Sequence, residues 1–215
     1  MHFVFDFGRV LFDWQPTALL QRVLPHRAPD AAAAARWQPA FFQGGDGLNG
    51  DWGEFDRGAV TPAELAARIA GRTGLAPDEV RAVVDAVPDA LQPIAASVAL
   101  LQRLRVRGRP MFYLSNMPEP YAGHLERAHA FVRGFDDGVF SARVGLIKPE
   151  PAIFALAAQR FGVPPHTLLF LDDHAPNVDA ARAAGWQALV FHDAAQCERE
   201  LRRAGWWPAA AATAR

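Results

Sequence analysis

Polar residues of reactive types end several short apolar runs in this chain. Asp6 ends the run HFVFD, Ser115 and Asn116 end PMFYLSN, and Asp172 and Asp173 end LLFLDD. Taken alone, each position has an ordinary structural explanation, because Asp and Ser at the end of a strand commonly cap the next helix. Together they indicate one binding site, since the carboxyl ends of strands in an open parallel sheet converge on the crevice where ligands bind.

Lys148 adds a positive charge to this set of residues. It lies in the segment GLIKPEPAIF, where Pro149 holds the turn and starts a helix. A single surface lysine is normally just solvated. Its place in the series of strand-end groups is what indicates that Lys148 faces the same crevice.

The apolar runs themselves predict the fold. Four segments read as strands buried on both faces, and helix-forming sequence separates them: His2–Asp6, Pro110–Ser115, Leu168–Asp172 and Gln187–His192. Alternating strands and helices predict an α/β fold with a Rossmann-like parallel sheet that helices cover on both faces.

A long segment between the first two strands lacks this pattern and reads as amphipathic helices. We predict a small helical domain at residues 14–93, inserted into a core domain made of residues 1–13 and 94–208. Its best local signal is Thr61-Pro62-Ala63-Glu64, which predicts a helix start with a capping box. The glycine-rich segment Gly44–Gly47 reads as a connector, and residues 209–215 read as a frayed tail.

Composition narrows the classes of partner. The net charge is −1, with 22 basic and 23 acidic residues, so no positive excess favours a nucleic acid or an anionic membrane. The chain begins without a signal-peptide pattern, its single Cys197 cannot form an internal disulfide, and no apolar stretch approaches the ~20 residues of a membrane span. We expect a cytoplasmic protein that acts on a small molecule; the sequence says nothing of its oligomeric state.

Four motifs in chain order resemble the signature motifs of the haloacid dehalogenase superfamily: FDFGRVL, LSN, GLIKPEPAIF and LDDHAPNVDAARAAGW. The resemblance runs from Asp6 to about Phe191. It is strongest to the branch that includes bacterial sugar-phosphate phosphatases such as α-glucose-1-phosphatase. The insertion, with Phe55-Asp-Arg-Gly58, is similar to the helical cap of that branch.

This resemblance implies a magnesium-dependent phosphatase that hydrolyses a small phosphorylated metabolite, with a sugar phosphate as one candidate. Asp6 would be the nucleophile and form an aspartyl-phosphate. Mg²⁺ would bind Asp6, the carbonyl of Gly8 and Asp173, with Asp172 binding directly or through water. The residues implied in catalysis or phosphate binding are Asp6, Gly8, Arg9, Ser115, Asn116 and Lys148.

One position departs from the pattern. Most phosphatases of the superfamily carry a second aspartate two residues after the nucleophile as the proton donor, and this chain has Gly8 there. Either turnover is slow or another acid serves, and Asp13 and His174 are the nearby titratable residues. For Arg9, a salt bridge to the cap is an alternative to binding the substrate.

Two other functions stay open. A 2-haloacid dehalogenase would need no leaving-group acid, although it would not explain the Asp172-Asp173 pair. A binding or regulatory protein with weak catalysis would be consistent with Gly8. Aromatic residues of the insertion line the substrate pocket or form the core of the cap: Trp14, Phe41, Phe42 and Trp52.

Overall fold

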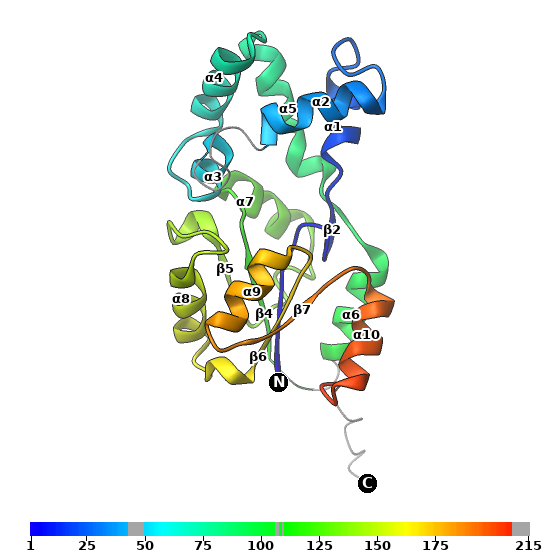
Figure 1. Ribbon diagram of the computed structural model, residues 1–215, viewed down its shortest axis with the longest axis vertical. Coiled ribbons are helices and arrows are strands. Elements are labelled where there is room, and N and C mark those ends of the chain that lie inside the picture. Colours follow the sequence, from blue (N-terminus) through cyan, green and yellow to red (C-terminus); the bar gives the residue numbers. More distant parts are fainter. Residues whose placement is uncertain (43–49, 106–107, 109, 208–215) are drawn as a thin grey trace.

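The computed structural model describes residues 1–42, 50–105, 108 and 110–207 (Figure 1). The predicted connector at Gly44–Gly47 and the predicted tail at 209–215 lie outside the described residues. A five-stranded parallel sheet has the order β5-β4-β1-β6-β7. Its strands are β1 (His2–Phe5), β4 (Met111–Ser115), β5 (Asp137–Phe140), β6 (Leu168–Asp172) and β7 (Gln187–Val190). The predicted α/β fold is confirmed.

Strand β1 lies in the middle of the sheet, and its apolar side chains are buried on both faces. Phe3 and Phe5 pack into one hydrophobic cluster while Val4 packs into the other. This alternation is why the N-terminal run is apolar at every position rather than at every second one. Strands β1 and β7 end at Phe5 and Val190, one and two residues before the predicted ends.

Strand β5 was not predicted, because its sequence DGVF begins with a charged residue and a glycine. Gly138 lies against the ring of Tyr113, where an added Cβ would approach ring atoms to 2.1 Å. The close packing of β5 on β4 therefore needs a residue without a side chain, and this removes the apolar signal at that position.

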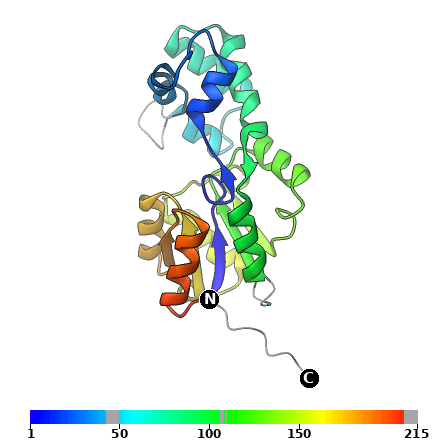
Figure 2. The same cartoon turned by 90° about the vertical axis from the view of Figure 1, so that its right-hand side faces the viewer.

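Helices cover both faces of the sheet, as Figures 1 and 2 show. Side chains of α6 (Ala95–Arg105), α7 (Glu119–Ala128) and α10 (Ala194–Arg203) join the cluster that contains Phe3. Those of α8 (Pro151–Phe161) and α9 (Ala175–Ala183) join the cluster that contains Val4. Two short 3₁₀ helices, Ser141–Arg143 and Pro165–Thr167, precede α8 and β6.

The insertion between β1 and α6 forms a helical layer beyond the carboxyl ends of the strands (Figures 1 and 2). Its described helices are α1 (Pro16–Val23), α2 (Ala31–Phe42), α3 (Asp51–Asp56), α4 (Pro62–Thr73) and α5 (Pro77–Ala90). Two short strands, β2 (Phe12–Asp13) and β3 (Gln92–Pro93), pair antiparallel where the chain enters and leaves this layer.

The predicted capping box at the start of α4 is confirmed. The Glu64 amide donates to Thr61 Oγ1 at 3.2 Å, and the Thr61 amide donates to Glu64 Oε2 at 2.7 Å. Pro62 occupies the first helical position, where its missing amide proton costs nothing. Within the described residues, every helix is too short or too polar to cross a bilayer.

Candidate active site

Lys148 lies buried between two carboxylates at the carboxyl edge of the sheet. Its Nζ is 2.8 Å from Asp6 Oδ1 and 2.6 Å from Asp172 Oδ2, and its side chain is 2% exposed. Asp6 follows β1 directly, with its amide bonded to the Leu171 carbonyl, and Asp172 is the last residue of the neighbouring β6. The parallel register therefore brings both carboxylates to the lysine.

Asn116 holds the backbone of this lysine. The Lys148 amide donates to Asn116 Oδ1 at 2.8 Å, and Asn116 Nδ2 donates to the Lys148 carbonyl at 3.0 Å. Both ends of the asparagine side chain are thus used to place Lys148, a role that its sequence position did not predict. Ser115, the residue before it, is buried at the end of β4 and lines the same cavity.

Three carboxylates gather around a space suited to a cation. Asp6, Asp172 and Asp173 each offer an oxygen, and these oxygens lie within 4.8 Å of one another. Anionic oxygens are the ligands that Mg²⁺ prefers, so the donor set fits this ion. The Gly8 carbonyl accepts no backbone hydrogen bond within the described residues, which leaves it available as the predicted fourth oxygen.

The oxygens of Asp172 are more fully engaged than those of its neighbours. Oδ1 accepts from the His174 amide at 2.8 Å and from Asn177 Nδ2 at 3.1 Å. Oδ2 accepts from Lys148 and, at 3.0 Å, from Asn177. This arrangement supports a positioning role for Asp172, with Asp6 and Asp173 as the more accessible oxygens. Asn177, near the start of α9, thus braces the Asp172 carboxylate.

Burial changes the proton affinity of the carboxyls. Loss of water raises the pKa of Asp6 to about 7, although the Lys148 ammonium opposes the rise, and Asp172 adds to it. Burial and the charge of Asp172 also raise the pKa of Asp173. A divalent cation between these groups would favour their ionised forms.

Arg9 lies beside Asp173 of the core and forms no ion pair with the described residues of the helical insertion. Its side chain is 68% exposed, and its Nε lies 3.4 Å from Asp173 Oδ2. Of the two alternatives for Arg9, the salt bridge to the cap is therefore not found among the described residues: the turn that begins at Phe7 and places Arg9 at a φ of 57° keeps the guanidinium beside the core carboxylate. Arg9 is absent from the cavity lining described next.

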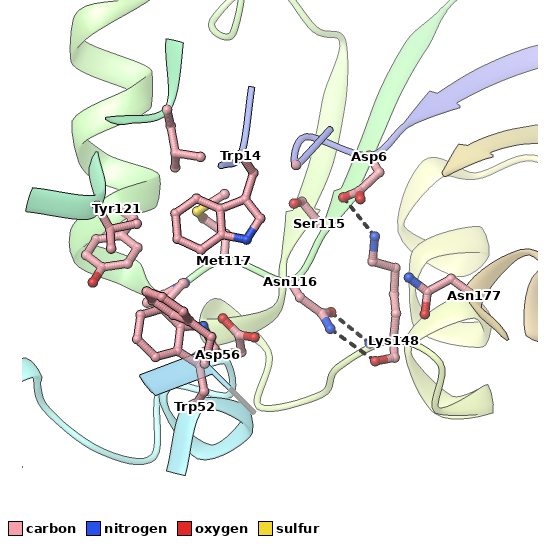
Figure 3. A pocket seen from close by; sticks show the side chains of 15 residues that line it. Asp6, Trp14, Trp52, Asp56, Ser115, Asn116, Met117, Tyr121, Lys148 and Asn177 are labelled. Atoms are coloured by element: carbon pink, nitrogen blue, oxygen red, sulfur yellow. Dashed lines mark hydrogen bonds and ion pairs between the residues drawn. The ribbon is translucent and has the colours of Figure 1, made fainter. Parts of the chain in front are cut away.

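A cavity of about 260 Å³ lies between the sheet edge and the helical insertion (Figure 3). Polar groups line its core side, among them Asp6, Ser115 and Lys148. Apolar and aromatic side chains form most of the remaining lining: Trp14, Phe42, Trp52, Val87 and Leu91 from the insertion, and Met117 and Tyr121 from the core. The prediction that aromatic residues of the insertion face the pocket thus holds for Trp14, Phe42 and Trp52.

Phe41 is different, because it is 1% exposed and belongs to the hydrophobic core rather than to the cavity wall. The lining rings contact one another edge to face. Ring centroids are 5.1 Å apart for Trp14 and Phe42, and 4.8 Å apart for Phe42 and Trp52. Such contacts stabilise the wall beyond simple burial.

Asp56 also lines the cavity, and it is the residue that sequence reasoning missed as a site residue. It ends α3 and lies next to Trp52 on the insertion side, across the cavity from Asp6 (Figure 3). Burial raises the pKa of its carboxyl to about 7, with Lys148 opposing the rise and Asp6 adding to it. A carboxylate at the end of a helix is unfavourable to the helix dipole, and this was the available signal.

The two acids named from sequence lie elsewhere. Asp13 is exposed and accepts a hydrogen bond from Gln15 at 2.7 Å. His174 is exposed at the start of α9. Neither lines the cavity.

Comparison with known proteins identifies the family. The sequence model of the haloacid dehalogenase-like hydrolases matches residues 19–185, which include Ser115, Lys148 and the Asp172-Asp173 pair. The chain therefore belongs to the haloacid dehalogenase-like hydrolases.

Among characterised relatives, the chain is similar to the sesquiterpene phosphatase astK of Aspergillus oryzae, at 27% identity, covering 93% of this chain and 94% of the relative. Among solved structures it resembles an L-2-haloacid dehalogenase, with a TM-score of 0.71 and 19% identity, covering 94% of this chain and 98% of the other. It also resembles an enzyme of Bacteroides thetaiotaomicron in complex with magnesium and inorganic phosphate, with a TM-score of 0.67 and 20% identity over 87% of this chain and 92% of the other. At such identities the structures establish the fold alone.

Proposed function

We propose that this hydrolase is a magnesium-dependent phosphatase that cleaves a small phosphate monoester through an aspartyl-phosphate on Asp6. The observation that carries the proposal is the cluster of Asp6, Asp172 and Asp173 with oxygens within 4.8 Å of one another, beside a buried lysine. Clustered carboxylates would repel a phosphate, whereas a bound divalent cation and Lys148 would neutralise the negative charge of the cluster.

The roles of the residues follow from their places around the cavity. Asp6 attacks phosphorus and becomes phosphorylated, which divides the hydrolysis into two easier steps. Ser115 donates a hydrogen bond to the phosphoryl oxygens, and Lys148 stabilises the charge that grows on them. When bound by Asp6, Asp173 and the Gly8 carbonyl, Mg²⁺ supplies further charge neutralisation at the phosphoryl group. We propose that residues 14–93 act as the cap that closes this site.

The family and the fold neighbours leave dehalogenation as the alternative. In that reaction Asp6 would displace halide from carbon, a step that needs no metal. The carboxylate cluster favours phosphoryl transfer. Without a bound cation, a second carboxylate such as Asp173 close to Asp6 would only add charge repulsion. A binding or regulatory role is less supported, since the structure keeps the nucleophile, the lysine and the carboxylates in contact.

For the alcohol part of the substrate, the cavity supports an apolar group better than a sugar. Every sugar hydroxyl that enters a pocket needs a hydrogen-bond partner. On the insertion side the wall offers mostly aromatic and aliphatic side chains, and the Tyr121 hydroxyl already donates to the Val84 carbonyl at 2.7 Å. The likeness to a sesquiterpene phosphatase agrees with an apolar alcohol, although a sugar phosphate remains a candidate from the sequence motifs.

Hydrolysis of an aryl phosphate with and without Mg²⁺ tests the proposal. We expect turnover only with the cation, and none for Asp6→Asn, because an amide is nearly isosteric but cannot form the phospho-intermediate. Turnover by a folded Asp6→Asn variant would remove Asp6 from this role. Chloride release from a 2-chloroacid in the absence of Mg²⁺ would favour the dehalogenase instead.

A comparison of a terpenyl monophosphate with glucose-1-phosphate then tests the substrate class. We expect kcat/KM to be higher for the terpenyl ester. Trp52→Ala should lower that value while leaving the rate on a small methyl phosphate nearly unchanged, because only the larger alcohol reaches the aromatic wall. A preference for the sugar phosphate would contradict the apolar assignment without affecting the phosphatase proposal.

A further inference from the structure

Asp56 is a carboxyl group in a wall that is otherwise mostly apolar. It lines the cavity from the insertion side together with Trp52, Val87 and Leu91. No described residue donates a hydrogen bond to its carboxyl oxygens. A half-buried carboxyl without a hydrogen-bond partner is costly, since burial of a polar group without a partner lowers stability. Its presence here therefore calls for a function at the site.

The backbone around Asp56 is fixed to the core. Ser141 Oγ donates to the Asp56 carbonyl at 2.5 Å, and the Arg57 guanidinium forms a bidentate ion pair with the Glu150 carboxylate. Gly58, at a φ of 75°, packs so closely that an added Cβ would lie 2.8 Å from the Ala142 carbonyl oxygen.

Ser141 and Glu150 bound the segment that carries Lys148. Glu150 is two residues from the lysine and also accepts from the Ile147 amide at 3.2 Å. The end of α3 and the lysine segment thus share direct contacts, although they are far apart in the sequence. These contacts place the Asp56 carboxyl relative to the phosphoryl site.

We propose that Asp56 is the catalytic acid and base of this enzyme. It would take over the proton transfer for which most phosphatases of the superfamily use an aspartate at the position of Gly8. This inference rests on the proposed phosphatase function. Among the described residues that line the cavity, the other carboxyl is Asp6, whose role as nucleophile excludes it from proton transfer to the leaving group.

The proton balance of both steps is complete with this assignment. In the first step the Asp6 oxygen bonds to phosphorus, the bond from phosphorus to the alcohol oxygen breaks, and protonated Asp56 gives its proton to that oxygen. In the second step water attacks phosphorus and passes a proton to the Asp56 carboxylate. The bond to Asp6 then breaks, which releases phosphate and restores both side chains.

The electrostatic surroundings agree with this cycle. A pKa of about 7 keeps both forms of Asp56 present near neutrality, which is the optimum for a group that must give and accept a proton. The charged and titratable groups around it come from every neighbouring element: Lys148, Asp6, Tyr121 on α7, and the Arg57–Glu150 ion pair. The charges of Lys148 and Asp6 have opposite effects on the pKa of Asp56, and burial is the main reason why this pKa is raised.

The test compares alkyl with aryl phosphates. An aryl oxide leaves without a proton, whereas an alkoxide needs one in the transition state. For Asp56→Asn we expect kcat/KM on alkyl phosphates to fall by about 10²–10⁴-fold and kcat/KM on aryl phosphates to fall by less than about 10-fold. The comparison uses kcat/KM because this quantity reports phosphoryl transfer to Asp6 and not the later attack of water, which is the same for both ester classes. The matched control is Glu54→Gln on the same helix, whose side chain pairs with Arg68 outside the cavity and should leave both rates unchanged.

The pH dependence of the unmodified enzyme gives a second readout that needs no variant. The ratio of kcat/KM on alkyl phosphates to kcat/KM on aryl phosphates should fall as pH rises from about 6 to about 9, because Asp56 loses its proton while any titration of Asp6 affects both values alike. Asp56→Asn should make this ratio independent of pH.

A rescue completes the design. An added Cβ at Gly8 would have no atom within 4 Å, so the backbone there has room to begin a side chain, and Gly8→Asp introduces a carboxyl two residues after the nucleophile. In the Asp56→Asn background it should restore alkyl turnover more than aryl turnover. Equal losses on both ester classes, or a ratio that does not change with pH in the unmodified enzyme, overturns the assignment of Asp56. A wild-type enzyme inactive on both classes overturns the phosphatase function itself.

Discussion

Replacement of Lys148 by methionine should destabilise the fold by an amount that depends on pH. Methionine keeps most of the length of the lysine stem and removes its charge. Two buried carboxylates would then lack their shared partner, those of Asp6 and Asp172, at present 2.8 and 2.6 Å from the ammonium nitrogen. Breaking a buried ion pair from one side costs about 3–5 kcal/mol.

The sign of the pH dependence follows from the pKa of Asp6. A carboxyl whose pKa is about 7 in the folded chain and 3.8 when unfolded binds a proton on folding, so its contribution to stability decreases as pH rises between these values. Lys148 lowers the pKa of Asp6, and its loss should raise that pKa further. The free energy of unfolding of the variant should therefore be lower by about 3–5 kcal/mol near pH 8. Near pH 5 the loss should be about half of this, because Asp6 is then protonated and is no longer an unpaired buried charge.

Urea denaturation at both pH values, with a chelator present, measures this difference. Arg81→Met is the control, because the Arg81–Asp85 pair is exposed and should contribute less than about 1 kcal/mol at either pH. Addition of Mg²⁺ should return part of the stability lost by Lys148→Met. A loss below about 1 kcal/mol near pH 8, or an equal loss at both pH values, would refute the reasoning.

Three further outcomes are expected. Asp173→Ala should weaken Mg²⁺ binding measured by calorimetry and lower activity with it, since one oxygen ligand and one charge are lost; unchanged affinity would count against this ligand. Gly58→Ala should destabilise the chain by about 1–3 kcal/mol in urea and reduce kcat, because the new Cβ meets the Ala142 carbonyl; wild-type stability would contradict that contact. Thr61→Ala should cost about 1 kcal/mol through loss of the capping box and leave kcat intact, which a thermal melt and an activity assay can check.

Residues whose environment is set by one buried strand could be predicted from the sequence. Asp6, Ser115 and Asp172 stand at the ends of apolar runs, and the parallel sheet brings such ends together whatever the details of packing. The same logic found the strands of the parallel sheet except β5, where close packing on Tyr113 requires Gly138 in place of an apolar residue.

Residues whose role depends on contact between distant segments could not be predicted. Asp56 belongs to the insertion, and only the contacts of its neighbours with Ser141 and Glu150 place it in the cavity. The partner of Arg9 depends on the course of one turn, which the sequence did not specify. Phe41 and Phe42 are adjacent on α2, but Phe41 is buried in the core and Phe42 lines the cavity. Which of the two faces the cavity depends on the rotation of that helix about its axis.

The order of the strands also has a consequence for how the chain is made. Strand β1 is synthesised before β4 and β6, the two strands with which it pairs, and both of these follow the whole helical insertion. Until those strands appear, its apolar side chains and both of its backbone edges lack their native cover, a state prone to non-native pairing. Contacts of such high sequence separation also slow folding. A nascent chain that stops before β6 would therefore be a natural client for chaperones, even though its helical insertion is already complete.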